Sequence, residues 1–244
     1  MMEFPALDRH SKIALSFSGG KDSLACIYLL RPHLDRITIF HNDTGDLLPE
    51  VMEVVEHVKA FAPHFVHIRG DVNAWIAENG LPTDLLPHSA HTIGGLMGEA
   101  STRLVPRYDC CWRNLMRPVH EAIKASGSTL VIRGTKRMDM KRLPMASGDV
   151  LDGIEVLLPL QEWSHQQVFD YLRAEGAPIC RVYEAVTNAP ECARCPAWLG
   201  EKRAAYLKQY HPALFADYRD RLRTVFAEID PVLLNLAAEL REMA

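Results

Sequence analysis

The stretch that decides the fold of this chain is Ile13-Ala14-Leu15-Ser16-Phe17-Ser18-Gly19-Gly20-Lys21-Asp22-Ser23. Its apolar start predicts a strand, its paired glycines predict a tight turn, and the apolar residues 24–30 predict a helix. Adjacent glycines have no Cβ atoms, so the backbone can pass close to a phosphate group. The first amides of the helix would point at that anion, and the helix dipole favours negative charge there. The segment therefore predicts a loop that holds phosphate or pyrophosphate.

The bulk composition is that of an ordinary globular protein. The chain has 244 residues, enough for one substantial core, with 48% hydrophobic and 24% charged residues. Its net charge of −4 argues against a general binder of polyanions. Residues 1–12 contain no signal-peptide core, and no apolar run approaches the roughly 18 residues of a membrane span. We therefore expect a cytoplasmic protein without a membrane segment.

Strand and helix patterns alternate through the first two thirds of the sequence. Apolar, β-branched runs predict strands at 13–17, 37–40, 65–68, 130–132 and 154–158. Helical patterns lie at 22–30, 48–61, 72–78 and 111–125, and from 166 onward. This alternation predicts an α/β fold with a doubly wound, mostly parallel five-stranded sheet of the Rossmann type and a helical C-terminal region. We expect residues 1–165 to form a nucleotide-binding domain and residues 166–244 a helical extension within the same structural unit.

Three local signals refine this outline. Residues 81–109 show no clean periodicity and predict a long functional loop. Pro118 predicts a kink or a late start in the helix over 111–125. Ser164, followed three residues later by Gln167, predicts a capping box at the start of a helix that ends at Gly176.

Polar turns follow three of the predicted strands. They are residues 18–23, residues 42–45 and the pair Arg133-Gly134. Ligands of doubly wound sheets bind at the carboxyl ends of the strands, near the point where the strand order reverses. We therefore expect these three turns to form one site at one edge of the sheet.

Six cysteines occur in the chain, and four of them form a ligand-like pattern. Cys110-Cys111 and Cys192-x-x-Cys195 can supply four thiolates, which suit zinc or an iron–sulfur cluster equally well by their chemistry. Cys180 has two interpretations, a small buried residue or a reactive thiol.

The motif Ser18 to Ser23 resembles the PP-loop of the N-type ATP pyrophosphatases, in the adenine nucleotide alpha hydrolase-like superfamily. Residues 10–200 resemble one branch, the phosphoadenosine phosphosulfate (PAPS) and adenosine phosphosulfate (APS) reductase family. The segment 110–118 is similar to that family's CC-x-x-R-K-x-x-P motif, with Asn114 in place of the lysine. With the distant Cys-x-x-Cys pair, the resemblance implies a [4Fe-4S] cluster on Cys110, Cys111, Cys192 and Cys195, and zinc is the alternative.

Three more segments carry the resemblance. Residues 41–50 are similar to the family's DTG…PE turn, residues 134–142 to its G-x-R-R-x-[DE]-S…R segment, and residues 158–163 to its P-L-x-x-W junction. The resemblance implies a bound adenine nucleotide, either ATP or PAPS/APS. The residues implied to hold it are Ser16, Ser18, Gly19, Gly20, Lys21, Asp22, Ser23, Asp43, Thr44, Gly45, Gly134, Lys136, Arg137 and Arg142.

Two departures from the family pattern shape the functional expectation. Its reductases carry a catalytic cysteine in a C-terminal E-C-G-[IL]-H motif, whereas this chain has no cysteine after Cys195. Its reductases also usually have a degraded PP-loop, whereas this loop is intact. We therefore expect an ATP pyrophosphatase that cleaves ATP to AMP and pyrophosphate and adenylates an acceptor for sulfur transfer. Lys21 and Asp22 are the expected catalytic residues, and Asp22 or Asp43 is a candidate for holding Mg²⁺.

Two alternatives stay open at this stage. One is a sulfonucleotide reductase that uses Cys180 as its nucleophile and a thioredoxin-like partner. The other is a non-catalytic, nucleotide-binding iron–sulfur redox sensor. Residues 103–142 carry ten Lys or Arg against three acids, which fits a wall for phosphates, a contact for tRNA or DNA, or a solvated face. A sulfur-donor protein and a second copy of the chain are further candidate partners.

Overall fold

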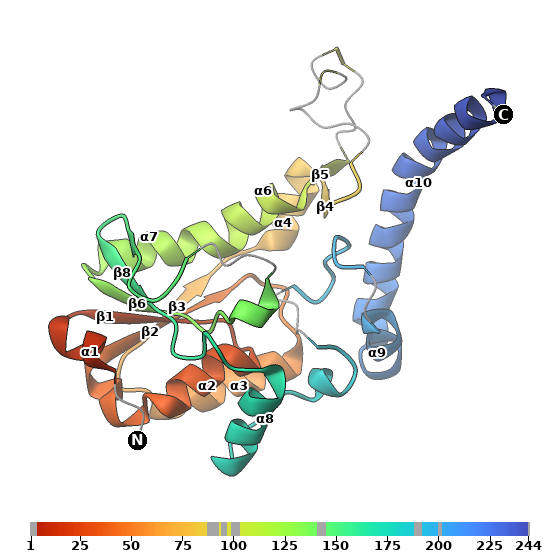
Figure 1. Ribbon diagram of the computed structural model, residues 1–244. Coiled ribbons are helices and arrows are strands. Elements are labelled where there is room, and N and C mark those ends of the chain that lie inside the picture. Colours follow the sequence, from red (N-terminus) through yellow and green to blue (C-terminus); the bar gives the residue numbers. More distant parts are fainter. Residues whose placement is uncertain are drawn as a thin grey trace. The chain divides into compact units, whose positions relative to one another are not determined.

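The computed structural model describes residues 4–86, 93, 97–98, 103–140, 145–187, 192–199 and 202–243 (Figure 1). The chain forms two compact units. Unit 1 contains residues 1–43, 47–69 and 117–184, and unit 2 contains residues 44–46, 70–116 and 185–244. The helix that starts at residue 165 packs on the helix over residues 21–29 within unit 1.

A six-stranded sheet forms the centre of unit 1. Its strands are β1 (Ile13–Phe17), β2 (Ile37–Asp43), β3 (Phe65–Arg69), β6 (Leu130–Ile132), β7 (Val150–Leu151) and β8 (Ile154–Leu157). They lie in the order β3-β2-β1-β6-β8-β7. The first five are parallel, and β7 pairs antiparallel with β8. The five predicted parallel strands are confirmed, and β7 adds an edge that the sequence reading missed.

Helices cover both faces of this sheet, with α2 and α3 on one face and α7 on the other (Figure 1). The helical elements of unit 1 are α1 (Pro5–Arg9), α2 (Lys21–Leu29), η1 (Arg31–Arg36), α3 (Pro49–Phe61), α7 (Arg117–Ala125), η3 (Arg137–Asp139), α8 (His165–Ala174) and η4 (Arg181–Glu184). The strand order reverses between β1 and β6. The turns that follow these two strands therefore meet at the switch point, where doubly wound sheets bind ligands.

Local sequence signals explain these elements. In α3, Val51, Val54, Val55 and Val58 are buried on one face, as their spacing predicts, and they anchor the helix to the sheet. The α8 capping box is also confirmed. Ser164 accepts a hydrogen bond from the Gln167 amide, and the Gln167 side chain accepts one from the Ser164 amide.

Unit 2 consists of helices and a small parallel sheet. Its elements are α4 (Val72–Asn79), β4 (Leu81–Thr83), β5 (Leu104–Pro106), α6 (Arg107–Cys111), the π-helical turn η2 (Trp112–Met116), α9 (Arg203–Tyr210) and α10 (Pro212–Glu242). β4 and β5 pair in parallel within the region predicted as one long loop, which is thus partly regular. His88 and His91, which that prediction covered, lie outside the described residues.

The predicted helix over 111–125 is helical throughout but changes type. The π-helical turn η2 follows α6 without a gap and precedes α7, whose second residue is Pro118. Proline has no amide hydrogen to donate to the carbonyl four residues before it, and a π-helical turn changes that hydrogen-bond pattern locally. The helix therefore does not start late at Pro118, and its irregularity is a π-helical turn.

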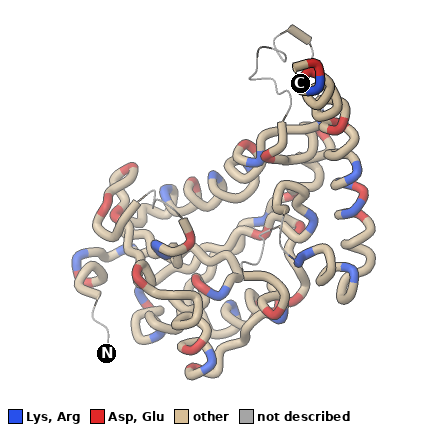
Figure 2. The backbone as a smooth tube through the Cα atoms, turned by 45° about the vertical axis from the view of Figure 1, so that its right-hand side comes forward, with Lys and Arg blue, Asp and Glu red and all other residues tan. Residues whose placement is uncertain are grey.

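None of the described helices combines the length and the apolar character needed to cross a bilayer. The longest, α10, carries charged residues of both signs along its tube in Figure 2.

Candidate functional site

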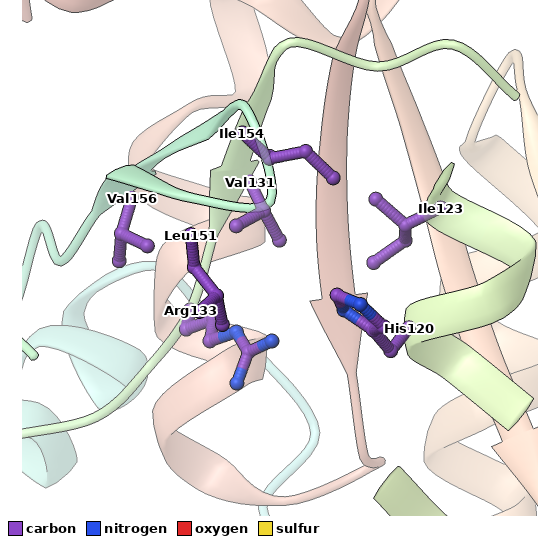
Figure 3. Close-up of a pocket in the computed structure, with 7 residues that line it drawn as sticks. All are labelled: His120, Ile123, Val131, Arg133, Leu151, Ile154 and Val156. Atoms are coloured by element: carbon purple, nitrogen blue, oxygen red, sulfur yellow. The ribbon is translucent and has the colours of Figure 1, made fainter. Parts of the chain in front are cut away.

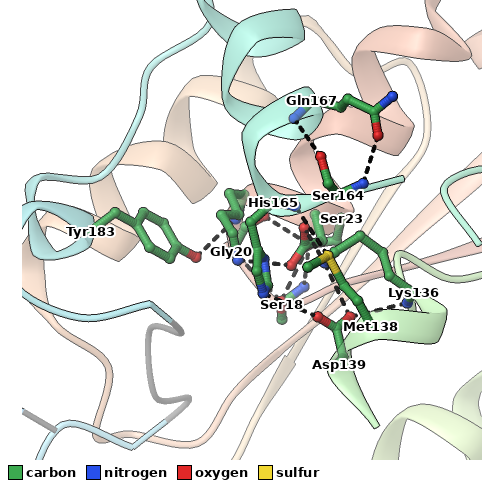
Figure 4. A network of polar contacts seen from close by, with 12 residues as sticks. Ser18, Gly20, Ser23, Lys136, Met138, Asp139, Ser164, His165, Gln167 and Tyr183 are labelled. Atoms are coloured by element: carbon green, nitrogen blue, oxygen red, sulfur yellow. Dashed lines mark hydrogen bonds and ion pairs between the residues drawn. The ribbon is translucent and has the colours of Figure 1, made fainter. Parts of the chain in front are cut away.

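The phosphate loop, residues 18–23, connects β1 to α2 and is closed by its own serines (Figure 4). Ser18 Oγ accepts a hydrogen bond from the Gly20 amide at 3.3 Å and lies 3.2 Å from Ser23 Oγ. Ser23 Oγ in turn donates to the Gly20 carbonyl at 3.1 Å. These bonds shape the loop before any ligand is present.

The atoms around this loop leave no room for a side chain at two positions, Gly19 and Gly134. Gly19 has a φ of +81°, and a Cβ atom there would lie 2.6 Å from a Val51 methyl group. A Cβ atom on Gly134, which follows β6, would lie 2.7 Å from the Asp22 carbonyl carbon and 2.7 Å from the Ser23 nitrogen. Backbone atoms cannot rotate away as side chains can, so Gly134 permits the β6 turn to touch the start of α2.

Four charged side chains form an alternating chain beside the loop. Lys21 Nζ lies 3.0 Å from Asp22 Oδ2, and Lys136 Nζ lies 2.6 Å from Asp22 Oδ1. Lys136 Nζ also lies 3.0 Å from Asp139 Oδ2. Lys21 is 2% exposed and Lys136 is fully buried, so both ammonium groups depend on these carboxylates for compensation. Burial lowers the pKa of Lys21, and the neighbouring Asp22 opposes that shift.

His165 lies at one end of this chain and two aromatic rings lie at the other. His165 Nε2 is 3.7 Å from Asp139 Oδ1. Burial, with the positive charges of Lys21 and Lys136, lowers the pKa of His165. Lys21 Nζ lies 5.0 Å from the ring centroid of Tyr183 and 5.8 Å from that of Phe169.

The other residues predicted to bind the nucleotide do not all lie beside the phosphate loop. Ser16 lies in β1, and Asp43 ends β2 with Oδ2 3.8 Å from His67 Nε2. Arg137 is exposed and pairs with Glu162 instead of joining the charged chain. Arg142 lies outside the described residues. Lys136, next to Arg137 in sequence, is the cation that reaches the phosphate loop.

The four cysteines of the predicted metal centre all belong to unit 2. Burial raises the pKa of the Cys110 thiol to about 12, and Cys111 and Cys195 add to that shift. Burial also raises the pKa values of Cys192 and Cys195. Cys111 and Cys195 act on the ionisation of Cys110, and Cys195 and Cys110 act on that of Cys192, so we call these four residues the cysteine cluster.

Polar groups of unit 2 support this cluster. The Thr44 hydroxyl lies 3.5 Å from Cys192 Sγ, and the Asn114 amide nitrogen donates to the Cys110 carbonyl at 3.0 Å and lies 3.8 Å from Cys110 Sγ. Asp46 accepts from the Arg194 amide at 3.1 Å and also pairs with its guanidinium group, which fixes the loop between Cys192 and Cys195. Thr44 and Gly45, expected at the nucleotide, thus belong to the unit that holds the cysteines.

The donor set of the cysteine cluster fits a thiophilic metal centre. Buried thiols with raised pKa values stay protonated at neutral pH, and a bound cation removes that penalty by stabilising thiolates. Within the described ranges, no three His, Cys, Asp or Glu side chains are close enough to hold one metal ion together. Small movements of the thiols toward a shared centre would therefore accompany metal binding.

Cys180 lies in unit 1, directly before η4, and is 5% exposed. Burial raises the pKa of its thiol to about 12, with the nearby Glu50 and Glu53 adding to the shift. Its thiol is protonated at neutral pH in this conformation, and a protonated thiol is a poor nucleophile.

A small pocket opens on the α7 side of the sheet (Figure 3). Its walls are mostly apolar and are formed by His120, Ile123, Val131, Arg133, Leu151, Ile154 and Val156. Burial lowers the pKa of Arg133, whose Nε atom has no hydrogen-bond partner among the described residues. The pocket includes Arg133 of the third predicted turn and no residue of the phosphate loop.

The fold and the loop together define an α/β protein of the PP-loop type. The family model "Phosphoadenosine phosphosulfate reductase domain" matches residues 12–197, and the chain belongs to this family, a branch of the PP-loop adenine nucleotide alpha hydrolase-like superfamily.

Two curated relatives and one solved structure illustrate the relationship. The chain is 23% identical to the phosphoadenosine 5'-phosphosulfate reductase of Proteus mirabilis over 177 residues, which cover 71% of this chain and 66% of that protein. It is 23% identical to the adenosine 5'-phosphosulfate reductase of Allochromatium vinosum over 193 residues, 75% of this chain and 67% of that protein. The chain thus spans about two thirds of the length of these relatives. A phosphate complex of the PAPS reductase from Candida auris shares the fold, with a TM-score of 0.50 and 16% identity over 71% of this chain and 77% of that chain.

Several site residues escaped the sequence reading. Asp139 lies in the segment 134–142, three residues after Lys136, and this spacing is the sequence signal for their ion pair. Tyr183, His165 and Arg194 lie far along the chain from their partners, and no local pattern marks them.

Proposed function

We propose that this protein binds the phosphates of an adenine nucleotide at the phosphate loop and cleaves ATP to AMP and pyrophosphate, adenylating an acceptor for sulfur transfer. The observation that carries this proposal is the pair of buried ammonium groups, Lys21 and Lys136, held by Asp22 at the start of α2. They supply positive charge beside the amides that a phosphate would use.

The residues suggest how the reaction would proceed. An acceptor oxygen attacks the α-phosphorus, and the bond from that phosphorus to the bridging oxygen breaks, so pyrophosphate leaves with the electron pair. Lys21 would stabilise the charge that develops on this leaving group, while Asp22 keeps Lys21 oriented. The terminal sulfur of a donor protein's persulfide would then attack the carbon that carries the adenylated oxygen of a small-molecule, tRNA or DNA acceptor, and AMP would leave with the electron pair. A second thiol of the donor would break the remaining S–S bond, which leaves the sulfur on the acceptor and the donor as a disulfide.

Mg²⁺ is the expected counter-ion of ATP, and the two candidate carboxylates differ in fit. Both oxygens of Asp22 face ammonium groups, so Asp22 is unsuited to ligate a cation while those ion pairs hold. Asp43, at the end of β2 with Oδ2 3.8 Å from His67 Nε2, is the carboxylate that we propose for Mg²⁺.

We propose that Cys110, Cys111, Cys192 and Cys195 hold a [4Fe-4S] cluster, with zinc as the alternative. When bound, such a cluster supplies redox or sulfur chemistry. Thr44 and Asn114 would contribute polar contacts beside the cysteines.

A sulfonucleotide reductase is the second candidate, because both curated relatives bear that name. Cys180 would be its nucleophile and would attack the sulfur of PAPS or APS, with a thioredoxin-like protein as reductant. The raised pKa of Cys180 argues that this route needs a conformation with a more solvated thiol.

Parallel assays distinguish these functions. We would purify the protein anaerobically, measure iron, zinc and labile sulfide, and offer it ATP with Mg²⁺, PAPS and APS. AMP and pyrophosphate from ATP support the adenylating enzyme, whereas sulfite from PAPS or APS with a thiol reductant supports the reductase. Loss of sulfite formation in Cys180→Ala would assign the nucleophile. Tight nucleotide binding without any turnover would favour the redox sensor.

A further inference from the structure

The hydroxyl group of Tyr183 occupies a position on the phosphate loop that a phosphate oxygen would need. The Lys21 amide, the first of α2, donates a hydrogen bond to Tyr183 Oη at 2.9 Å (Figure 4). A Cβ atom on Gly20 would lie 3.1 Å from the same oxygen, so the hydroxyl sits directly over the glycine turn. Free amides at a helix start are the donors that bind phosphate.

The ring of Tyr183 also covers the ammonium group of Lys21. Lys21 Nζ lies 5.0 Å from the ring centroid, within cation–π range. Phe169 packs edge-on against Tyr183 with a centroid distance of 5.6 Å, which holds the ring in place. Together these contacts leave Lys21 only 2% exposed. The loop is therefore closed by an aromatic side chain where a ligand must enter.

We propose that Tyr183 is a plug that competes with the nucleotide phosphates for the Lys21 amide and must leave when they bind. This inference rests on the proposed function, because it assumes that phosphates bind at this loop. Tyr183 would thus set which ligands enter, since a pyrophosphate group gains more contacts on displacing it than a single phosphate does. η4, which carries Tyr183, would move with it.

Binding of inorganic pyrophosphate and of ATP with Mg²⁺ tests the plug, measured by calorimetry on the anaerobic full-length protein. Tyr183→Phe keeps the ring but removes the hydroxyl that accepts the hydrogen bond from the Lys21 amide. Because the ligand then no longer has to replace one net hydrogen bond, we expect its affinity to rise about three- to tenfold. Tyr171→Phe is the matched control in the same unit and should leave affinity unchanged. Weaker binding by Tyr183→Phe would show that the hydroxyl holds the ligand, and equal binding would show no competition; either result overturns the plug.

A different result of the same experiment would contradict the proposed phosphate site itself. If neither ligand binds wild type, Tyr183→Phe or the loop-opening Tyr183→Ala, the loop is not a phosphate site, and the plug fails with it. Binding by wild type that is no tighter in Tyr183→Phe overturns only the plug.

A second, independent observation concerns the end of α10. Apolar residues recur there with alternating spacings of three and four, which is the heptad pattern of a coiled-coil seam. The seam consists of Phe226, Ile229, Leu233, Leu236, Leu240 and Met243. Apart from Ile229, each exposes more than half of its surface, between 53% for Leu233 and 75% for Met243. Such a continuous exposed stripe marks a contact surface.

We infer that this seam binds the same seam of a second copy in antiparallel orientation. Antiparallel pairing sets Phe226 against Met243 and Leu233 against Leu236 of the partner helix. The flanking acids Asp230 and Glu239 then face Ala237 and Val232 and not another acid, so no like charges oppose. Roughly 100 Å² from each seam residue gives about 1,200 Å² in total, the lower limit for a specific interface.

Sedimentation equilibrium of the full chain tests the seam. Wild type should dimerise with concentration, and Leu236→Asp should raise the dissociation constant at least about tenfold, because a buried unpaired carboxylate is costly. Leu234→Asp is the matched control, since Leu234 is 57% exposed and lies off the seam. A monomeric wild type at about 100 μM would overturn the inference, as would equal effects of the two variants.

Discussion

The phosphate loop of unit 1 and the cysteine cluster of unit 2 both bury ionisable groups, but they compensate charge in different ways. Lys21 and Lys136 face Asp22 and Asp139, so the chain of charges is balanced by the protein itself. The cysteine cluster contains groups of one kind that disfavour each other's ionisation. The first site is therefore organised before a ligand arrives, whereas the second is expected to be completed by a metal.

The largest expected effect tests the dependence of unit 2 on a metal. Cys192→Ala removes one ligand of the proposed cluster, so iron and labile sulfide should fall to background together with visible absorbance. Cys180→Ala, in unit 1, is the control and should keep full metal content. Retention of iron by Cys192→Ala would contradict the assignment, and zinc in place of iron in wild type would favour the alternative.

Removing one charge from the balanced chain of unit 1 should cost stability. Lys136→Met leaves Asp22 and Asp139 without the buried ammonium group between them, and we expect a loss of about 3–5 kcal/mol in the free energy of unfolding. Arg137→Met removes the exposed neighbour that pairs with Glu162 and should have no measurable effect. Denaturant titration of both variants measures the difference. Equal stability would mean that the chain of charges is not the organising feature.

A steric change at the switch point should have a smaller effect. Gly134→Ala places a methyl group 2.7 Å from the backbone of Asp22 and Ser23, so β6 and α2 must separate. We expect a loss of about 1–3 kcal/mol in unfolding free energy and weaker pyrophosphate binding. A variant with wild-type stability and affinity would show that this contact is easily relaxed.

The smallest expected effect concerns pH. Burial lowers the pKa of His41, whose Nδ1 lies 2.9 Å from the Phe17 carbonyl and whose neighbours include His67, Asp43 and Glu56. Between the two pKa values His41 is protonated in the unfolded chain but neutral in the folded protein. The contribution of His41 to the free energy of unfolding is therefore fully present above about pH 6.5 and is lost as the pH falls toward the lowered pKa.

His41→Asn should flatten this pH dependence by up to roughly 1.4 kcal/mol per pH unit, while a side-chain amide can still donate to Phe17. His64→Asn, the same substitution at an exposed position of unit 1, is the matched control. Unfolding free energies between pH 5.5 and about 7.5 measure both slopes. An unchanged slope in His41→Asn would place the pH response at another group, such as His165.

The sequence by itself determined the parallel strands of the sheet, the glycine loop and the capping box of α8. These features arise from residues close together in the chain, where periodicity, glycine conformations and short hydrogen bonds act directly. Only the tertiary structure decided which charges meet. It places Lys136 on Asp22, Tyr183 on the Lys21 amide and Thr44 beside Cys192. Such contacts depend on how strands and helices pack across more than a hundred residues, and no local propensity encodes that packing.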